Sequence, residues 1–316
     1  AVRSASGCVV IGTTISVTSP GAPPVPTINP YINPVCQGMP FLLSVVNPDP
    51  AATYTWTGPG SYTATGATVT RTNADPTMTG TYAVTAKIGS CVSGALVFSL
   101  TVNPLPSVTV PASLTYCEGS SVPEAQFTST PSGATYTWTN SDTGIGLAGS
   151  GTGNVPSFTA INNTTSAITS TITVTPTLND CVGPSSTYTI TINPQPEVTV
   201  PANFTVCAGS SVSGSNFSSV PAGATYTWTN SNTTIGLPGS GSGNVPAFTA
   251  INTSASVATA TITVTPFLNG CNGPSISYVI TVNPLPRVDA LTNLTVCSGA
   301  TITASAFSST PGGATF

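Results

Sequence analysis

Charged side chains are almost absent from this chain. Its 316 residues include four Lys or Arg, eight Asp or Glu and no His, and no basic residue lies between Lys87 and Arg287. Nucleic-acid binding depends on basic side chains that neutralise phosphates, so it is excluded. Catalytic bases, triads and zinc sites draw on His, Lys and clustered carboxylates. The sequence therefore predicts a non-enzyme without cofactor or metal, and favours a structural or binding protein.

Long hydrophobic runs are also missing. No stretch reaches the roughly 20 apolar residues of a membrane helix, so no membrane span is expected in this segment. Disorder is not expected either, because 39% of the residues are hydrophobic and the mean hydropathy is +0.28. The many Thr, Val, Ile, Gly and Pro residues favour strands and turns over helices.

A repeat of 90 residues organises the chain. Cys117, Cys207 and Cys297 are spaced by this period, and residues 117–206 and 207–296 are identical at most positions without gaps. Each block ends on a phrase such as Val102-Asn-Pro-Leu-Pro106, whose two prolines interrupt a strand and act as a short spacer. We therefore expect tandem copies of one domain.

The expected boundaries follow these phrases. They are 1–26 for the closing strand of a preceding repeat and a Pro-rich linker, 27–104 for a divergent repeat, 105–194 and 195–284 for two full repeats, and 285–316 for the start of a further, truncated repeat. Both ends then fall inside domains, which predicts a segment of a longer array.

Short stretches within each repeat alternate apolar residues with Thr or Ser. Clear examples are 107–110, 169–175 and 188–192, and glycine-rich or Asn-Asp turns separate them. This period of two predicts half-buried strands in an all-β, immunoglobulin-like sandwich.

The eight cysteines suggest disulfides within repeats. We expect the pairs Cys36–Cys91, Cys117–Cys181 and Cys207–Cys271, with Cys8 and Cys297 unpaired inside this segment. Such bonds require an oxidising compartment. The alternative is a zinc site, which needs closely spaced ligands and finds no His here.

Each complete repeat carries one tryptophan, Trp56, Trp138 or Trp228, two residues after a tyrosine on the same side of a strand. Recurrence favours a core position, as in immunoglobulin-like domains, over a platform for sugar stacking. Tyr82 in Gly80-Thr-Tyr82 resembles a tyrosine corner and is interpreted as structural.

Other candidate sites are weak. The glycine-rich stretch 149–154 lacks the Lys and Ser/Thr of a phosphate-binding loop and is interpreted as a loop or bulge. The carboxylates are scattered singly and form no calcium-binding cluster; they are Glu118, Glu124, Asp142, Asp180 and Glu197.

These motifs carry a family resemblance. The Asn-Pro-Leu-Pro joints, Val-Cys-x-Gly-Ser-Ser at 206–211, Ala-Thr-Tyr-Thr-Trp-Thr-Asn at 134–140, Gly-Asn-Val-Pro-x-Phe-Thr-Ala at 153–160 and Leu-Asn-Gly-Cys-x-Gly-Pro-Ser at 268–275 resemble PKD-like/immunoglobulin-like repeats of giant Bacteroidota surface proteins. That resemblance implies gliding-adhesin or appendage proteins exported by type IX secretion.

The leading functional hypothesis is a non-catalytic stalk at the bacterial cell surface, serving attachment, motility or cell–cell contact. The alternative is a set of carbohydrate-binding modules of a secreted protein. Expected partners are the neighbouring repeats of the same chain. Further candidates are other copies of the chain in a lateral homo-oligomer, and surface polysaccharide or other cells bound through a tip outside this segment.

Overall fold

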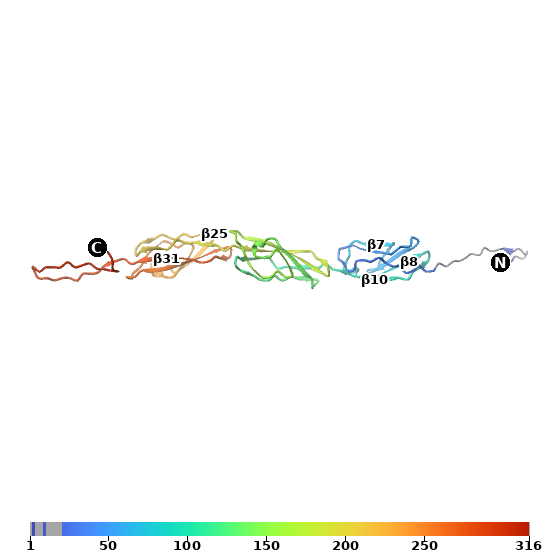
Figure 1. The fold of residues 1–316 in the computed structure, drawn as a ribbon, viewed down its shortest axis with the longest axis horizontal. Helices are drawn as coiled ribbons and strands as arrows, with labels where there is room; N and C mark the ends of the chain where they lie inside the picture. Colours follow the sequence, from blue (N-terminus) through green and yellow to red (C-terminus); the bar gives the residue numbers. More distant parts are fainter. Residues whose placement is uncertain (1, 4–8, 11–20, 316) are drawn as a thin grey trace. The chain divides into compact units, whose positions relative to one another are not determined.

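The predicted all-β class is confirmed. The computed structural model describes residues 2–3, 9–10 and 21–315, and Figure 1 shows strands in every repeat. The helical segments of the described residues are three single turns of 3-10 helix, η1 (Pro76–Met78), η2 (Thr143–Ile145) and η3 (Thr233–Ile235).

The third repeat shows the common plan. Its main sheet has the order β23-β31-β29-β26-β27, with β30 paired to the end of β29. The strands are β23 (Phe204–Cys207), β26 (Thr225–Asn230), β27 (Ser240–Ser242), β29 (Ala258–Leu268), β30 (Cys271–Asn272) and β31 (Ile276–Asn283). The first strand, β23, runs parallel to β31, whereas the remaining neighbours are antiparallel.

Two shorter ladders complete the third repeat. They pair β22 (Glu197–Thr199) with β25 (Ser218–Val220), and β24 (Ser211–Val212) with β28 (Phe248–Thr249). Val198 and Val212 from these ladders pack into the same core as Trp228, Ile262 and Tyr278 of the main sheet. Both layers therefore enclose one hydrophobic core, as expected for a sandwich.

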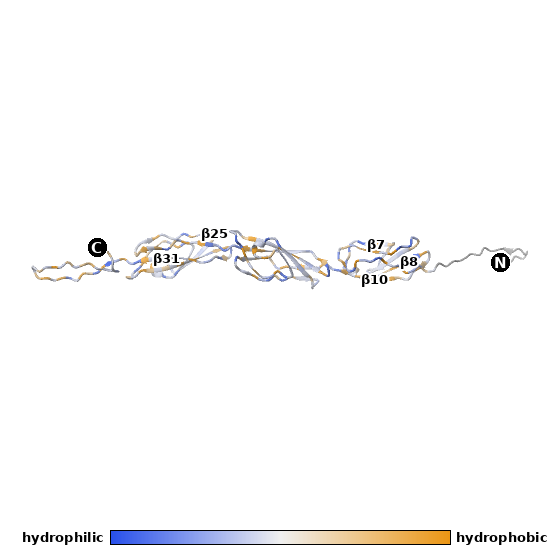
Figure 2. Cartoon of the chain, viewed as in Figure 1, coloured by the Kyte–Doolittle hydropathy of each residue, from blue (hydrophilic) through white to orange (hydrophobic). Residues whose placement is uncertain are grey.

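Alternation along the strands produces this core. In β29 the side chains of Ala260, Ile262 and Val264 are buried, while the threonines between them face outward. Figure 2 shows the same alternation of hydrophobic and more hydrophilic residues along the strands. Outward hydroxyls pair across strands, as between Thr263 and Ser277 at 2.8 Å. A Thr/Ser-rich surface is thus compatible with regular sheet packing.

The second repeat follows the same plan, with the sheet order β13-β21-β19-β16-β17 and β20 paired to β19. These strands are β13 (Leu114–Cys117), β16 (Thr135–Asn140), β17 (Ser150–Thr152), β19 (Ile168–Leu178), β20 (Cys181–Val182) and β21 (Ser186–Asn193). Its short ladders pair β12 (Ser107–Thr109) with β15 (Thr128–Thr130) and β14 (Ser121–Val122) with β18 (Phe158–Thr159).

The first repeat is a variant of this plan. Its main sheet has the order β10-β8-β5-β6, with β9 paired to β8, and two separate ladders pair β3 with β11 and β4 with β7. The strands are β3 (Val35–Cys36), β4 (Phe41–Ser44), β5 (Thr53–Gly58), β6 (Tyr62–Thr65), β7 (Thr68–Arg71), β8 (Gly80–Ile88), β9 (Cys91–Val92), β10 (Leu96–Leu100) and β11 (Val102–Asn103).

The predicted tyrosine corner is confirmed in the first repeat. Tyr82 is fully buried on β8, and its hydroxyl donates to the backbone oxygen of Met78 at 3.0 Å. This bond ties the 3-10 turn η1 to the core.

The flanking residues form two further ladders. One pairs β1 (Val2–Arg3) with β2 (Val9–Val10). The other pairs β32 (Arg287–Val288) with β33 (Ser309–Thr310), in which Arg287 faces Thr310 as Glu197 faces Val220 one period earlier. Residues 287–310 therefore repeat the opening of the third repeat. Cys8 and most of residues 1–26 lie outside the described residues, so the expectations for them stay predictions.

Candidate functional site at the joints between repeats

The cysteines that open the repeats occupy equivalent positions. Cys36 faces Asn103, Cys117 faces Asn193 and Cys207 faces Asn283, each in a parallel ladder with the last strand of the same repeat. In all three repeats the residue after the cysteine donates its N–H to the backbone oxygen of that asparagine, at 2.8 to 2.9 Å. The opening cysteine is therefore held at the end of the repeat where the last strand leaves.

The second cysteine of a repeat follows a tight hairpin turn. In the second repeat the turn is Asn179-Asp180, and in the third it is Asn269-Gly270. All four turn residues have positive φ, as a two-residue type I′ turn requires, and Asn, Asp and Gly tolerate this conformation. The turn places Cys181 and Cys271 at the hairpin end, where both side chains are buried.

The two disulfides of the described residues join consecutive repeats. Cys36 is bonded to Cys181, with Cα atoms 5.5 Å apart, and Cys117 is bonded to Cys271, with Cα atoms 5.6 Å apart. The predicted pairs Cys36–Cys91, Cys117–Cys181 and Cys207–Cys271 are therefore wrong. Cys207 and Cys297 are exposed free thiols, and Cys91 is half-buried on β9.

Strand register explains why a pair within one repeat cannot form. In the third repeat Cys207 lies level with the end of β31, whereas Cys271 lies level with the end of β29, which runs the opposite way. The register separates them by about eleven residue steps, or about 36 Å. A disulfide requires Cα atoms closer than about 7 Å. The opening cysteine therefore bonds to the hairpin of the following repeat.

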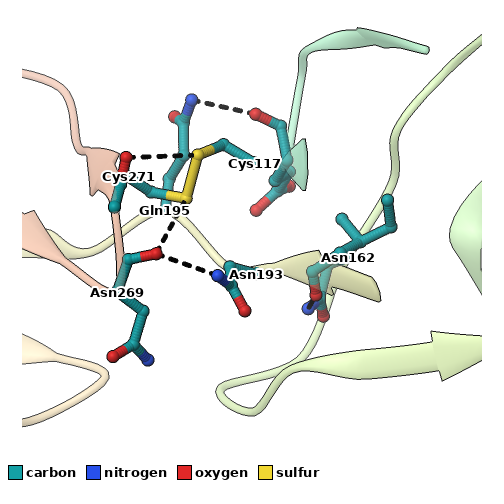
Figure 3. Close-up of a disulfide and its surroundings, with 9 residues drawn as sticks. Cys117, Asn162, Asn193, Gln195, Asn269 and Cys271 are labelled. Atoms are coloured by element: carbon teal, nitrogen blue, oxygen red, sulfur yellow. Dashed lines mark hydrogen bonds between the residues drawn. A yellow bond between two sulfur atoms is a disulfide. The ribbon is translucent and has the colours of Figure 1, made fainter. Parts of the chain in front are cut away.

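Figure 3 shows the joint around Cys117 and Cys271. The side-chain amide of Asn193 donates to the backbone oxygen of Asn269 at 2.9 Å, so the last strand of one repeat holds the hairpin turn of the next. Gln195 of the linker donates to the backbone oxygen of Glu118 at 3.0 Å. Buried Asn162 donates to Ile192 and anchors the strand that presents Asn193.

The joint around Cys36 and Cys181 has the same parts. The amide of Asn103 lies 3.5 Å from the backbone oxygen of Asn179, the residue equivalent to Asn269. The linker is held differently, because the side-chain oxygen of Gln37 accepts from the backbone N–H of Leu105 at 3.3 Å.

A glycine permits the close approach at both joints. A Cβ atom on Gly183 would lie 1.7 Å from the backbone oxygen of Pro106, and one on Gly273 would lie 1.7 Å from that of Pro196. Any side chain there would push the linker away from the hairpin. Sequence reasoning missed these glycines and the joint asparagines. The signal was present, because each of the two Cys-x-Gly-Pro motifs, at 181–184 and 271–274, lies in a repeat that is preceded by an Asn-Pro-x-Pro joint.

We predict that a non-reducing digest will show the pairing between repeats. Trypsin and a Glu-specific protease together release fragments 4–71, 88–118, 125–197 and 198–287, and Cys181 is the single cysteine of 125–197. Tandem mass spectrometry should find Cys181 joined to Cys36, and Cys271 joined to Cys117. A peptide joining Cys181 to Cys117 would contradict the pairing.

The tryptophans lie inside the repeats rather than at the joints. Their exposed fractions are 0% for Trp56, 4% for Trp138 and 3% for Trp228. Gly151 and Gly241 lie against the indole rings of Trp138 and Trp228, because a Cβ atom on either would fall 2.3 Å from a ring carbon. The sugar-platform interpretation of these residues is therefore wrong, since no ring face is open to a ligand.

The carboxylates have local structural roles. Asp142 accepts from the N–H of Gly144 at 2.8 Å and caps η2, and Glu124 accepts from Asn154 at 2.7 Å. Asp180 lies in a hairpin turn, while Glu118 and Glu197 border a hollow of about 280 Å³. In the described part of the chain, no group of three or more Cys, Asp or Glu could hold a metal ion. No helix among the described residues is long and apolar enough to cross a bilayer.

We predict that the chain loses stability at alkaline pH because of two buried tyrosines. Burial raises the pKa of Tyr188 to about 12 and raises the pKa of Tyr278 above its usual 10.0. Below pH 10 these phenols are neutral in both states, so stability should not change through them. Above pH 10 only the unfolded chain ionises, and unfolding becomes easier by up to about 1.4 kcal/mol per pH unit per tyrosine.

Thermal unfolding followed by circular dichroism at a series of pH values tests this expectation. The midpoint should fall above about pH 10, and the variant Tyr188→Phe should reduce the fall. An unfolding midpoint that stayed constant up to about pH 12 would contradict the raised pKa values of Tyr188 and Tyr278.

One comparison agrees with the repeat plan. A family model described as a PKD-like domain matches residues 114–196 and 204–286. Similar solved structures include three N-terminal domains of the bacteriophage RB49 Hoc capsid protein, at 15% identity and TM-score 0.33, covering 83% of this chain and 99% of that chain. Mouse cadherin-23 EC22–24 has 14% identity and TM-score 0.35, covering 83% and 99%.

A third similar structure contains Dpr2 Ig1–Ig2 in complex with DIP-Theta Ig1–Ig3, at 11% identity and TM-score 0.38, covering 83% of this chain and 100% of that chain. Among curated proteins, no sequence matches this chain. The two PKD-like matches together cover more than half of the residues, and they include the strands that carry both joint cysteines of each full repeat. The chain therefore belongs to the PKD-like domain family.

Proposed function

We propose that this chain is a non-catalytic structural segment of a large extracellular adhesin or filamentous appendage on a bacterial surface. It would carry an adhesive part, located elsewhere in the protein, for attachment, motility or cell–cell contact. The observation that supports this role best is that both disulfides bond one repeat to the next. A covalent bond at each joint suits a chain that works under tension.

The bonds also support the location. Disulfides form and persist outside the cytosol, in secreted and surface proteins. Each bond closes a loop of about 150 residues, which stabilises the folded chain by about 5 kcal/mol through the entropy of the unfolded state. The resemblance to Bacteroidota surface repeats favours export by type IX secretion. Lateral association into a homo-oligomer stays a prediction.

The surface chemistry fits a passive spacer. The outward faces of the strands carry hydroxyl side chains, and residues 88–286 contain no Lys or Arg. Trypsin-like proteases therefore have no cleavage site in this range, folded or unfolded. The same surface offers no cation for anionic ligands.

An in-register deletion in the parent protein tests the function. Removing residues 117–206 puts Cys207 and Cys271 in the places of Cys117 and Cys181, so Cys36 can bond to Cys271. An antibody raised against residues 21–315 should label intact cells that carry either the full-length parent protein or the shortened one. The purified segment should not bind the surfaces to which the cells attach.

The matched control keeps the number of repeats and removes both bonds, in a variant with Ser in place of Cys36, Cys117, Cys181 and Cys271. Cells that carry it should attach normally at rest and detach earlier under flow, whereas loss of one bond alone should have little effect. Labelling that requires cell lysis would contradict the surface location. Saturable binding of the purified segment to the attachment surface would assign the adhesive role to the repeats themselves.

A further inference from the structure

We propose that the end of the third repeat, formed by Cys207 and Asn283, is a docking site for the cysteine-bearing hairpin of a following PKD-like repeat. Docking would close a disulfide with Cys207. The inference goes beyond the proposed function and does not depend on it, because it concerns how repeats bind one another rather than where the protein acts.

The site already has the geometry of the two occupied joints. Cys207 faces Asn283 in a parallel ladder, as Cys117 faces Asn193, and the N–H of Ala208 donates to the backbone oxygen of Asn283 at 2.9 Å. The groups that bind a hairpin at the occupied joints are the opening sulfur and the asparagine amide. At the third repeat the sulfur is exposed, and among the described residues the Asn283 amide has no hydrogen-bond acceptor.

The occupied joints define the chemistry of the occupant. Each hairpin presents Leu-Asn-x-Cys on a type I′ turn, with the asparagine backbone oxygen aimed at the amide of the preceding repeat. A glycine two residues after the cysteine lets the linker lie against the hairpin. Residues 287–310 reproduce the opening ladder of a repeat in register, so the occupant we commit to is the hairpin of that repeat.

The bond forms by oxidation of two thiols. The Cys207 thiol and the hairpin thiol each lose a proton, and together they give two electrons to a disulfide oxidant, which is reduced to two thiols. Without the hairpin, Cys207 should behave as a docking thiol with a preference for one peptide sequence.

Thiol–disulfide exchange on the chain itself tests this preference. The probe is a peptide with the sequence of residues 265–274, whose cysteine carries a 2-thiopyridyl group. Attack by a thiolate joins the peptide to the protein and releases pyridine-2-thione. Cys297 is the internal control, because it lies one period later with a similar local sequence but outside any strand. Trypsin cleaves after Arg287 and separates the two cysteines.

The ratio of labelling at Cys207 to labelling at Cys297 should be about tenfold higher with this peptide than with a peptide of reversed sequence. Activated cysteamine should show no such preference. The variant Asn283→Ala should abolish the preference for the hairpin peptide while leaving the rate with cysteamine and the circular dichroism spectrum unchanged. Equal ratios for the two peptides would overturn the proposal.

A second arm uses a folded partner. Appending residues 227–286 after residue 316 completes the fourth repeat in register and supplies one hairpin cysteine. A non-reducing digest should find that cysteine joined to Cys207. A bond to Cys297, or a hairpin cysteine that stays reduced beside a reduced Cys207, would overturn the proposal. Surface labelling of intact cells could still succeed in either case. Such a result would overturn the docking proposal without contradicting the proposed function.

Discussion

Removing one of the two disulfides should lengthen the chain under force by less than half, whereas removing both should lengthen it several-fold. The bonds Cys36–Cys181 and Cys117–Cys271 interlock, because each closes a loop that contains one end of the other. Three chain segments, 36–117, 117–181 and 181–271, therefore run in parallel between the two bonds. The shortest of them, 117–181, sets the maximum extension at about 220 Å.

The variants follow from this connectivity. Without Cys36–Cys181, the path from 36 to 271 runs through 36–117 and reaches about 280 Å; without Cys117–Cys271, it runs through 181–271 and reaches about 310 Å. Without either bond the same segment extends to about 800 Å. Each bond thus acts as a backup for the other, which disulfides confined to single repeats could not do.

Single-molecule force spectroscopy measures these lengths, with one attachment point before residue 36 and the other after residue 271. The double variants Cys36→Ser/Cys181→Ser and Cys117→Ser/Cys271→Ser leave no unpaired partner behind, and a fully reduced sample is the control. Additive lengthening, in which each pair releases about half of the total, would contradict the interlocked bonds.

The sequence predicted the repeat period and the strand class because both depend on local pattern. Alternation of Ile, Val and Ala with Thr determines the two faces of β29 wherever the neighbouring strands lie. The 90-residue spacing of Cys117, Cys207 and Cys297 similarly predicts a repeated unit without any knowledge of its contacts.

Disulfide pairing could not be predicted in the same way. Counting residues between Cys117 and Cys181 gives no information on whether they lie at the same end of a sheet. That depends on the parallel pairing of β13 with β21, which puts Cys117 beside Asn193. The 90-residue period also does not identify the partner of Cys117. Cys181 and Cys271 occupy equivalent positions in their repeats, and a bond from Cys117 to either is compatible with two cysteines per repeat.

The sequence predicts a loop or bulge for the glycine-rich stretch 149–154. The structure places Ser150–Thr152 of this stretch in strand β17, where Gly151 lies against the indole of Trp138. The sequence signal was the recurrence of glycine at 151 and 241, each 13 residues after a tryptophan. The contact between these glycines and the indole rings depends on which strand lies beside the strand that carries the tryptophan, and the sequence pattern does not give that pairing.

Replacing Gly151 by Ala should destabilise the second repeat strongly. The new Cβ would lie 2.3 Å from Cζ2 of Trp138, a residue that is itself 4% exposed and cannot move aside freely. Overpacking of this kind costs about 3 kcal/mol, which corresponds to a fall of about 15 °C in the unfolding midpoint of one repeat. Tryptophan fluorescence during thermal unfolding would measure it.

Gly149→Ala is the matched control, because it lies two residues away in the same segment. Its Cβ would meet Thr143 at 3.5 Å, an ordinary contact, and its backbone is not in the left-handed region. The expected change is within about 0.5 kcal/mol. Comparable losses from the two variants would indicate a general intolerance of side chains in this segment rather than contact with the indole.

A double-mutant cycle can assign the loss to the ring itself. In a chain with Trp138→Leu the space beside residue 151 is open, so adding Gly151→Ala should cost little, and the coupling energy should be about 2 kcal/mol. Independent effects would contradict the contact. Since the same contact covers the indole face, strong coupling would also explain why Trp138 cannot serve as a sugar platform: the position where a sugar would stack is filled by the backbone of β17.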